Sequence, residues 1–289
     1  MAISSLHLLL TYTCNFGCDH CFLFGSPDAE GVMRIQDLRH ILEEGKKAGI
    51  ESICVEGGEP FLYYPILLWS IRRAREMGMQ AGIVTNCYWA TSVEDAREWL
   101  KPVPELGISD ISLSEDYFHY EEGKNPKFAR EAAEELEIPY STISIEDPRD
   151  EDAPPAANIM LKGRAATTVA PDLPKKPWQS YGKCEHEDFE NQGRVHIDPF
   201  GFVHVCQGIC IGNLFEKGLK EIFDEFDPRK HPICGPLLEG GPAKLAETYG
   251  LPHREEYADE CEFCFDVRLK LRERFPDILC PDQMYGVND

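Results

Sequence analysis

Three cysteines near the start of the chain could bind a metal. Cys14, Cys18 and Cys21 are spaced as C-x3-C-x2-C, directly behind the apolar run at residues 6–10. With a fourth ligand from elsewhere, three thiolates can hold zinc. Three thiolates can also hold a [4Fe-4S] cluster that keeps one iron free for an exogenous ligand. The thiols alone leave both readings open.

Strand-like and helix-like hydrophobic patterns alternate along the chain, and the elements that they predict must position these thiols. Strand-like apolar runs occupy residues 5–13, 50–58, 79–87, 108–116, 138–147 and 157–165. Helical patterns fill residues 33–49, 63–78, 92–107 and 125–137 between them. Strands interleaved with helices imply parallel crossovers, so the pattern predicts an α/β fold, a partial (β/α)6 TIM-like barrel.

Polar and glycine residues follow the ends of the predicted strands. The cysteine loop follows the first strand, and the third and fourth strands end in Thr85-Asn86 and Ser114-Glu115-Asp116. The second strand ends in Gly57, Gly58, Glu59 and Pro60. Active sites of such folds gather at the C-terminal ends of the strands, so we expect these residues to meet there.

The composition narrows the class of protein. The chain has 289 residues, 12 cysteines and a formal net charge of -22. No apolar run reaches the roughly 18 residues that a membrane span needs, and no signal segment is visible, so we expect a cytoplasmic protein. In a reducing compartment clustered cysteines favour metal ligation over disulfides. The negative charge argues against nucleic acid as a partner.

The thiol motif and the glycine-rich strand end together resemble the radical S-adenosylmethionine (radical SAM) superfamily. The resemblance follows the barrel in order from Cys14 to about Ala166. It implies that the open iron of the cluster binds SAM. It also implies reductive cleavage of SAM to a 5′-deoxyadenosyl radical, which takes hydrogen from a substrate.

The resemblance assigns expected roles to individual residues. Gly57, Gly58, Glu59 and Pro60 resemble the element that meets the SAM methionine, where glycine lets a ligand approach the backbone. Polar contacts to SAM are expected from these residues: Thr85, Asn86, Ser114, Glu115 and Arg164.

The same resemblance places aromatic rings near SAM, and the position after the fourth strand suggests groups that could reach the substrate. Phe16 and His20 flank the cysteines, and His20 occupies the family's aromatic position near adenine. Asp116, Tyr117 and His119 follow the fourth strand and are candidate acid, base or radical-relay groups. For each polar residue taken alone, strand-end capping or a solvated loop is the alternative.

A second set of cysteines lies beyond a Pro- and Lys-containing linker candidate at residues 169–179. The order Cys184, Gly201-x4-Cys206 at the end of a predicted hairpin, then Cys261-x2-Cys264, resembles the SPASM/Twitch extension, which binds auxiliary [4Fe-4S] clusters. Lys270 and Arg274 stand where the longer SPASM pattern has further cysteines, so the shorter Twitch type with one cluster is expected. A structural zinc on the same four residues is the alternative. Cys210, Cys234 and Cys280 have no assigned role.

These patterns predict two domains, a radical SAM barrel at residues 1–170 and a Twitch-like domain at residues 171–289. The expected function is oxidation or another modification of a small molecule or of a peptide or protein side chain. The expected electron donor is external, such as flavodoxin or ferredoxin. Because the chain begins almost at the first strand, we expect no N-terminal peptide-recognition domain. A non-catalytic iron-sulfur electron-transfer or scaffold protein on the same fold is the second hypothesis.

Overall fold

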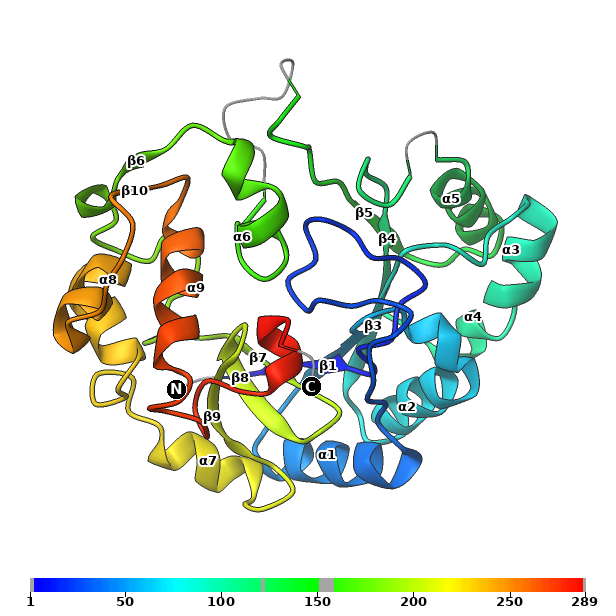
Figure 1. The fold of residues 1–289 in the computed structure, drawn as a ribbon. Helices are drawn as coiled ribbons and strands as arrows, with labels where there is room; N and C mark the ends of the chain where they lie inside the picture. The colour runs from blue at the N-terminus through cyan, green and yellow to red at the C-terminus, as the bar shows by residue number, and fades with distance from the viewer. Residues whose placement is uncertain (1–2, 121–122, 151–158, 288–289) are drawn as a thin grey trace.

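The computed structural model describes residues 3–120, 123–150 and 159–287. Its first half alternates strands and helices (Figure 1). The order is β1 (Ser5–Leu9), α1 (Ile35–Lys47), β2 (Ser52–Glu56), η1 (Pro60–Tyr63), α2 (Tyr64–Glu76), β3 (Gln80–Thr85), α3 (Val93–Leu100), α4 (Val103–Leu106), β4 (Asp110–Ser114), α5 (Asn125–Glu135) and β5 (Tyr140–Ile143). Strands β1 to β5 pair in parallel in that order, which confirms the predicted α/β class.

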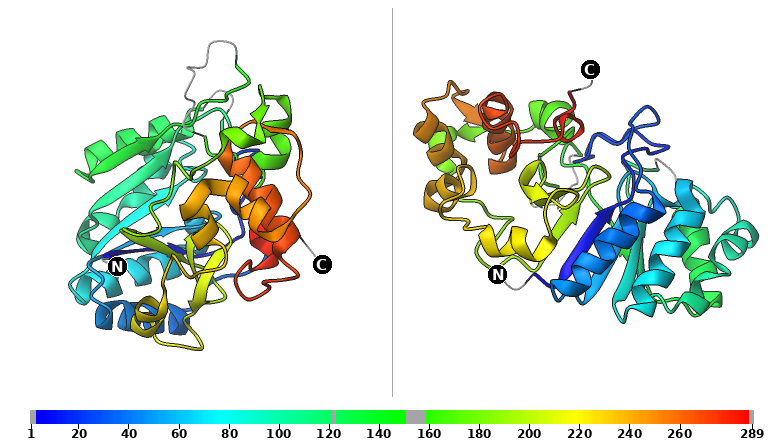
Figure 2. Two further views of the ribbon diagram at one scale, coloured as in Figure 1. Left: turned by 90° about the vertical axis from the view of Figure 1, so that its left-hand side faces the viewer. Right: turned by 90° about the horizontal axis from the view of Figure 1, so that it is seen from below.

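The helices follow from apolar faces and local caps. In α1, Leu38, Ile41 and Leu42 are buried on one face, as the helical period predicts. The Ser92 side chain accepts a hydrogen bond from the Asp95 amide and so caps α3. Figure 2 shows α1 to α5 along one outer side of the sheet.

The predicted sixth strand at residues 157–165 is wrong over its described part. Residues 159–164 form no strand, and residues 157 and 158 lie outside the described chain. Gly163 has a φ of +63°, which interrupts an extended run. The amide of Leu161 donates to the Asp259 carboxylate and that of Arg164 to the Cys21 carbonyl oxygen, so neither joins a sheet.

Strand β7 of the C-terminal half joins the barrel sheet at the edge beside β1. The sheet order is β5-β4-β3-β2-β1-β7 (Arg194–Ile197), then β8 (Phe202–Cys206) and β9 (Ile209–Asn213). Strand β7 runs parallel to β1. Strands β7 and β8 (Phe202–Cys206) form the predicted hairpin, in which the Gly201 amide donates to the Asp198 carbonyl oxygen. Gly201 has a φ of +85°, as this turn requires.

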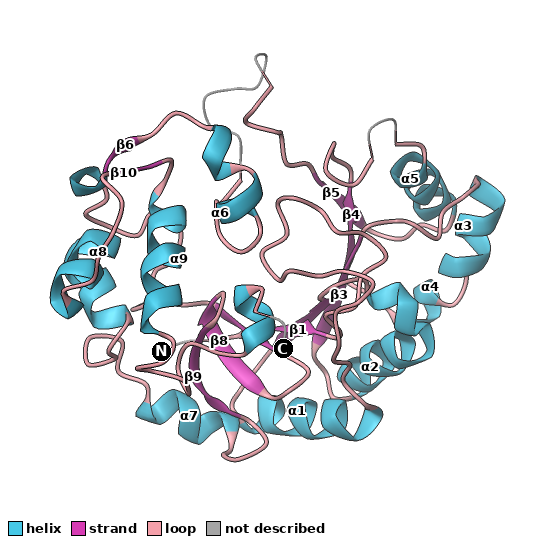
Figure 3. Ribbon diagram, viewed as in Figure 1, coloured by secondary structure: helices cyan, strands magenta, loops and turns pink. Residues whose placement is uncertain are grey.

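The rest of the C-terminal half is mainly helical (Figure 3). It comprises α6 (Ala165–Thr168), η2 (Ala170–Asp172), β6 (Lys176–Pro177), η3 (Trp178–Ser180), β9 (Ile209–Asn213), α7 (Leu219–Glu225), α8 (Cys234–Tyr249), β10 (Glu256–Tyr257), α9 (Glu260–Leu271) and η4 (Asp282–Tyr285). Within the linker candidate, β6 pairs with β10.

The two predicted domains share one sheet and one apolar core. The buried cluster that contains Leu6 and Leu8 of β1 also contains Val195 and Ile197 of β7 and Leu245 of α8. The boundary at residue 170 therefore stays a prediction. Across the described ranges, every helix is too short or too polar to cross a membrane.

Candidate functional site

The loop after β1 carries the first three cysteines into a cavity at the C-terminal ends of the strands. Cys14, Cys18 and Cys21 all line it, and its empty space, open mouth included, is about 1090 Å³. The amides of Phe16 and Gly25 donate to the sulfur atoms of Cys14 and Cys21 at 3.4 and 3.3 Å. Burial raises the pKa of Cys14 and of Cys18 to about 12, so these thiols need a metal centre or a cation to become thiolates.

The structure brings most of the predicted residues to this cavity. Those that line it with the cysteines are Phe16, His20, Gly57, Gly58, Thr85, Asn86, Ser114 and His119. They come from the cysteine loop and from the ends of β2, β3 and β4, as parallel strands predict. The others, Glu59, Pro60, Glu115, Asp116, Tyr117 and Arg164, lie outside the set of lining residues.

The two glycines after β2 allow two backbone segments to touch. A Cβ atom on Gly58 would lie 2.1 Å from the Thr13 carbonyl oxygen, and one on Gly57 would lie 2.5 Å from that of Thr11. The Gly58 amide donates to the Thr11 carbonyl oxygen at 2.6 Å. Sequence reasoning assigned the missing side chains to the approach of a ligand. Here they first permit the approach of the segment that leads into Cys14.

Glu59 joins the ends of β2 and β3 through hydrogen bonds. Its fully buried carboxylate accepts hydrogen bonds from the Asn86 amide at 2.7 Å, the Thr85 hydroxyl at 2.9 Å and the Phe61 amide at 3.0 Å. Burial raises the pKa of Glu59 to about 7, and these donors oppose that rise. Glu59 therefore holds Thr85 and Asn86 in place.

The three candidate reactive groups after β4 separate in the structure. Asp116 accepts from His119 Nδ1 at 2.9 Å, and His119 lines the cavity. The Oδ2 atom of Asp116 and the Nδ1 atom of His20 are buried without a hydrogen-bond partner in the described chain. Tyr117 is 57% exposed and does not line the cavity. Glu115 forms an ion pair with Arg130 at 2.7 Å.

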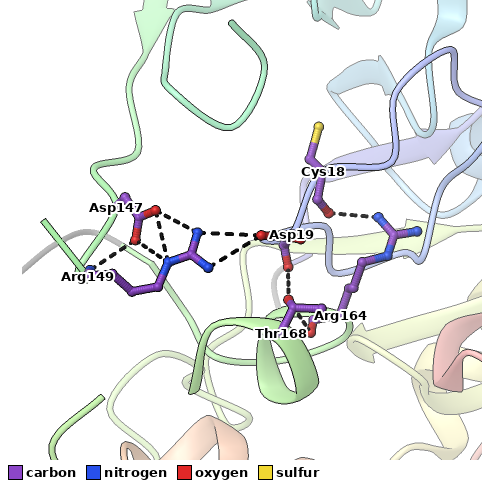
Figure 4. A network of polar contacts seen from close by, with 6 residues as sticks. All are labelled: Cys18, Asp19, Asp147, Arg149, Arg164 and Thr168. Atoms are coloured by element: carbon purple, nitrogen blue, oxygen red, sulfur yellow. Dashed lines mark hydrogen bonds and ion pairs between the residues drawn. The ribbon is translucent and has the colours of Figure 1, made fainter. Parts of the chain in front are cut away.

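Arg164 holds the cysteine loop through hydrogen bonds to its backbone, one of which is drawn in Figure 4. Its guanidinium donates to the carbonyl oxygens of Cys18 at 2.7 Å and Gly25 at 2.8 Å. The hydroxyl of Thr168 donates to the Asp19 carbonyl oxygen at 2.9 Å. Two guanidinium donors of Arg164 are thus used by the loop, and its expected contact with a SAM carboxylate stays a prediction.

A second cavity, with about 410 Å³ of empty space, lies between α8, α9 and the end of β8. Cys184, Cys206, Cys261 and Cys264 all line it, so residues far apart in the sequence converge as the C-terminal pattern predicts. Burial raises the pKa of Cys184 to about 11, and the neighbouring Cys206 and Cys264 add to that rise.

The three unassigned cysteines lie in two places. The Cys210 and Cys280 sulfur atoms are 3.2 Å apart, and Cys210 is 3.2 Å from His204 Nδ1. Cys234 is fully buried, and after burial the largest influences that raise its pKa are Cys206 and Cys264. Cys234 therefore lies near the second cavity without lining it.

Several residues of the first cavity were missed from the sequence. Glu56, at the end of β2, lines it, and its carboxylate lies 3.2 Å from both His7 Nδ1 and His196 Nε2. The sequence could have indicated these residues, because His7, Cys54 and Glu56 interrupt the otherwise apolar strands β1 and β2. A wall of Ile143, Ile145, Ile159 and Met160 completes the cavity.

The comparisons with known proteins agree with this arrangement. Residues 8–137 match the model of the Radical SAM superfamily. The chain is 28% identical over 241 residues to the putative peptide biosynthesis protein YydG of Bacillus subtilis (strain 168), with 82% of this chain and 70% of YydG covered. A probable GTP 3',8-cyclase of Pyrococcus abyssi (strain GE5 / Orsay) is 29% identical over 114 residues, 39% of this chain and 35% of that protein. The chain therefore matches only about a third of the cyclase's length.

Two solved structures share the fold. BtrN in complex with AdoMet and 2-DOIA superimposes with a TM-score of 0.54 and 17% identity, over 84% of this chain and 89% of BtrN. The anSMEcpe structure with bound AdoMet gives a TM-score of 0.50 and 14% identity, over 95% and 97% of the two chains. At these identities the likeness shows the partial TIM-barrel fold. The cavity, its three thiols and the glycine-lined strand end fit a [4Fe-4S] cluster with SAM, and residues 8–137 match the radical SAM superfamily, which uses both.

Proposed function

We propose that this protein is a radical SAM enzyme that modifies a peptide or protein side chain. We also propose that it carries one auxiliary [4Fe-4S] cluster on Cys184, Cys206, Cys261 and Cys264. The cofactors at the first site supply reductive cleavage of SAM and a radical that takes hydrogen from the substrate. The observation that carries the proposal is the convergence of these four cysteines on a second cavity beside the first.

The spacing of the sulfur atoms supports a multinuclear cluster over a single zinc ion. Tetrahedral zinc with bonds of about 2.3 Å would hold its thiolate sulfurs roughly 3.8 Å apart. Among the described residues, the groups of three or more ligand atoms within 4.8 Å of one another are His7–Cys54–Glu56 and His20–Asp116–His119. Neither cysteine set is among them, as expected if each surrounds a larger iron-sulfur core.

In this proposal the chain's own residues bind and orient the cofactors and the substrate. Cys14, Cys18 and Cys21 ligate the first cluster, while Gly57, Gly58, Thr85, Asn86 and Ser114 form the SAM side of the cavity. Phe16 and His20 offer rings to the adenine, and Phe118 lies against His20 with ring centroids 4.5 Å apart. The Asp116–His119 pair is the candidate acid and base, because His119 faces the cavity and Asp116 fixes its Nδ1.

Two findings favour a peptide as the substrate. YydG, which is named for peptide biosynthesis, aligns with most of this chain. The wall of Ile143, Ile145, Ile159 and Met160 suits an aliphatic side chain, and Glu56 can pair with an amine or amide group. The weaker likeness to BtrN concerns the fold and carries no argument about substrate.

The test is SAM cleavage by the anaerobically reconstituted, reduced protein with and without short peptides encoded beside its gene. We expect slow uncoupled formation of 5′-deoxyadenosine that one peptide accelerates, together with a mass change in that peptide. Acceleration by small-molecule alcohols instead would overturn the peptide assignment. Absence of cleavage under every condition would favour the second hypothesis, a non-catalytic iron-sulfur protein.

A further inference from the structure

Lys162 is a buried cation between the two cysteine cavities. It lines the first cavity with Cys14, Cys18 and Cys21, and it lines the second with Cys206 and Cys261. The residue is only 7% exposed. Among the described residues, Lys162 alone belongs to both sets of lining residues.

Hydrogen bonds fix the segment around Lys162 to both cysteine sets. On one side, the Leu161 amide donates to Asp259, whose side chain also caps α9, the helix that carries Cys261 and Cys264. On the other side, the Arg164 amide donates to the Cys21 carbonyl oxygen at 3.0 Å. Residues 161–164 therefore connect the two cysteine sites, and Lys162 lies within this segment.

The positive charge of Lys162 is only weakly balanced by a neighbouring carboxylate. Its Nζ atom lies 3.7 Å from Glu187 Oε1, at the long end of ion pairing, and 5.7 Å from the centre of the Phe22 ring. A buried ammonium group needs close counter-charge to remain charged.

A second buried cation faces the same cysteines. Arg268 is 1% exposed and lines the second cavity, and it donates to two neutral oxygens, the Gln207 carbonyl and the Tyr285 hydroxyl. Its Nε atom is buried without a partner in the described chain. A [4Fe-4S] core with four thiolates carries about two negative charges when oxidised, which two buried cations would offset.

We propose that Lys162 sets the reduction potential of the auxiliary cluster and makes it an electron acceptor on the side facing the first cavity. The inference rests on the proposed auxiliary cluster. When the cluster gains one electron from a low-potential donor, its negative charge rises by one, and a fixed positive charge nearby stabilises the reduced form. In a buried site of low effective dielectric this interaction is weakly screened.

The test compares Lys162→Met, which removes the charge, with Lys162→Arg, which keeps it. Lys183→Met is the matched control, because Lys183 adjoins Cys184 in sequence but its side chain is 73% exposed and pairs with Glu185 at 2.6 Å. Redox titration with dithionite, followed by electron paramagnetic resonance, reads the auxiliary signal as the one that SAM does not alter. Iron content shows whether each variant still holds both clusters.

We expect reduction of the auxiliary cluster to become at least about tenfold less favourable in Lys162→Met, a fall of about 59 mV for a one-electron couple. Lys162→Arg and Lys183→Met should stay close to the parent protein. An unchanged potential in Lys162→Met with full iron content would overturn the inference and leave the auxiliary cluster standing. A parent protein without a second cluster would defeat the proposed function first, and the inference with it. If Lys162→Met loses iron, the same comparison in Lys162→Gln decides.

Discussion

Arg164 donates a hydrogen bond to the carbonyl oxygen of Cys18 across 146 residues of sequence, at 2.7 Å (Figure 4). A second bond from the same guanidinium reaches Gly25. One side chain thus fixes two points of the loop that presents the three thiols. The shape of this loop depends on a residue that follows β5 in the sequence.

Arg164→Met should therefore loosen the loop and make the first cluster labile. Two charge-assisted hydrogen bonds would be lost, each worth about 1.5–3 kcal/mol. We expect faster loss of about four irons to a chelator in anaerobic solution. Arg149→Met is the control, because Arg149 reaches the Asp19 side chain of the same loop only at 3.4 Å and is partly exposed. Equal iron loss in both variants would show that Arg164 has no special part.

Gly58→Ala should reduce iron at the first site as well as SAM affinity. Its Cβ would lie 2.1 Å from the Thr13 carbonyl oxygen, so the segment next to Cys14 must move. Such overpacking typically costs about 1–3 kcal/mol or more. Gly82→Ala in β3 is the matched control, since its Cβ would meet nothing closer than the Asp110 carbonyl oxygen at 3.4 Å. Normal iron with weaker SAM binding, measured by calorimetry, would instead favour the sequence-based explanation that the glycines serve the ligand.

Glu59 should give the protein a pH-dependent stability. Its pKa is raised by burial from 4.5 to about 7, so the folded state holds this proton where the unfolded state has released it. The free energy of unfolding should therefore fall as the pH rises from about 4.5 to 7, by an amount on the order of 3 kcal/mol. Urea unfolding at several pH values should show this fall in the parent protein and a smaller one in Glu59→Gln. Identical pH profiles would contradict the assignment.

The second cysteine set predicts a specific metal count. The reconstituted protein should carry about eight irons, and the variant with alanine at Cys184, Cys206, Cys261 and Cys264 about four, with little zinc in either. Because all four ligands are thiolates of the protein, the spectrum of the auxiliary cluster should not respond to SAM. Stoichiometric zinc beside four irons would make the second site structural. About twelve irons would bring Cys210, Cys234 and Cys280 into a third cluster.

The sequence predicted features that follow from local patterns better than features that depend on contacts between residues distant in sequence. Cys14, Gly57, Thr85 and Ser114 could be placed at one site, because alternating strands and helices put successive strand ends on the same edge. The prediction of a strand around Met160 was wrong. The backbone amides of Leu161 and Arg164 bond to Asp259 and Cys21, which are distant in sequence, so the local pattern could not show these contacts.

The contacts of buried polar groups could not be predicted in the same way. Arg164 holds the cysteine loop, and Lys162 lies between the two cavities. Both arrangements depend on how the C-terminal half packs against the barrel. Local pattern carries no information about that packing.

The most direct test of the whole account is the amount of 5′-deoxyadenosine formed from SAM by the dithionite-reduced protein. The reconstituted parent chain should form it, and alanine at Cys14, Cys18 and Cys21 together should abolish it, because no cluster would then remain to bind and reduce SAM. Alanine at the four auxiliary cysteines should leave this uncoupled cleavage detectable. Undiminished cleavage in the triple variant, or none in the parent protein with its iron complete, would contradict the assignment of the first site.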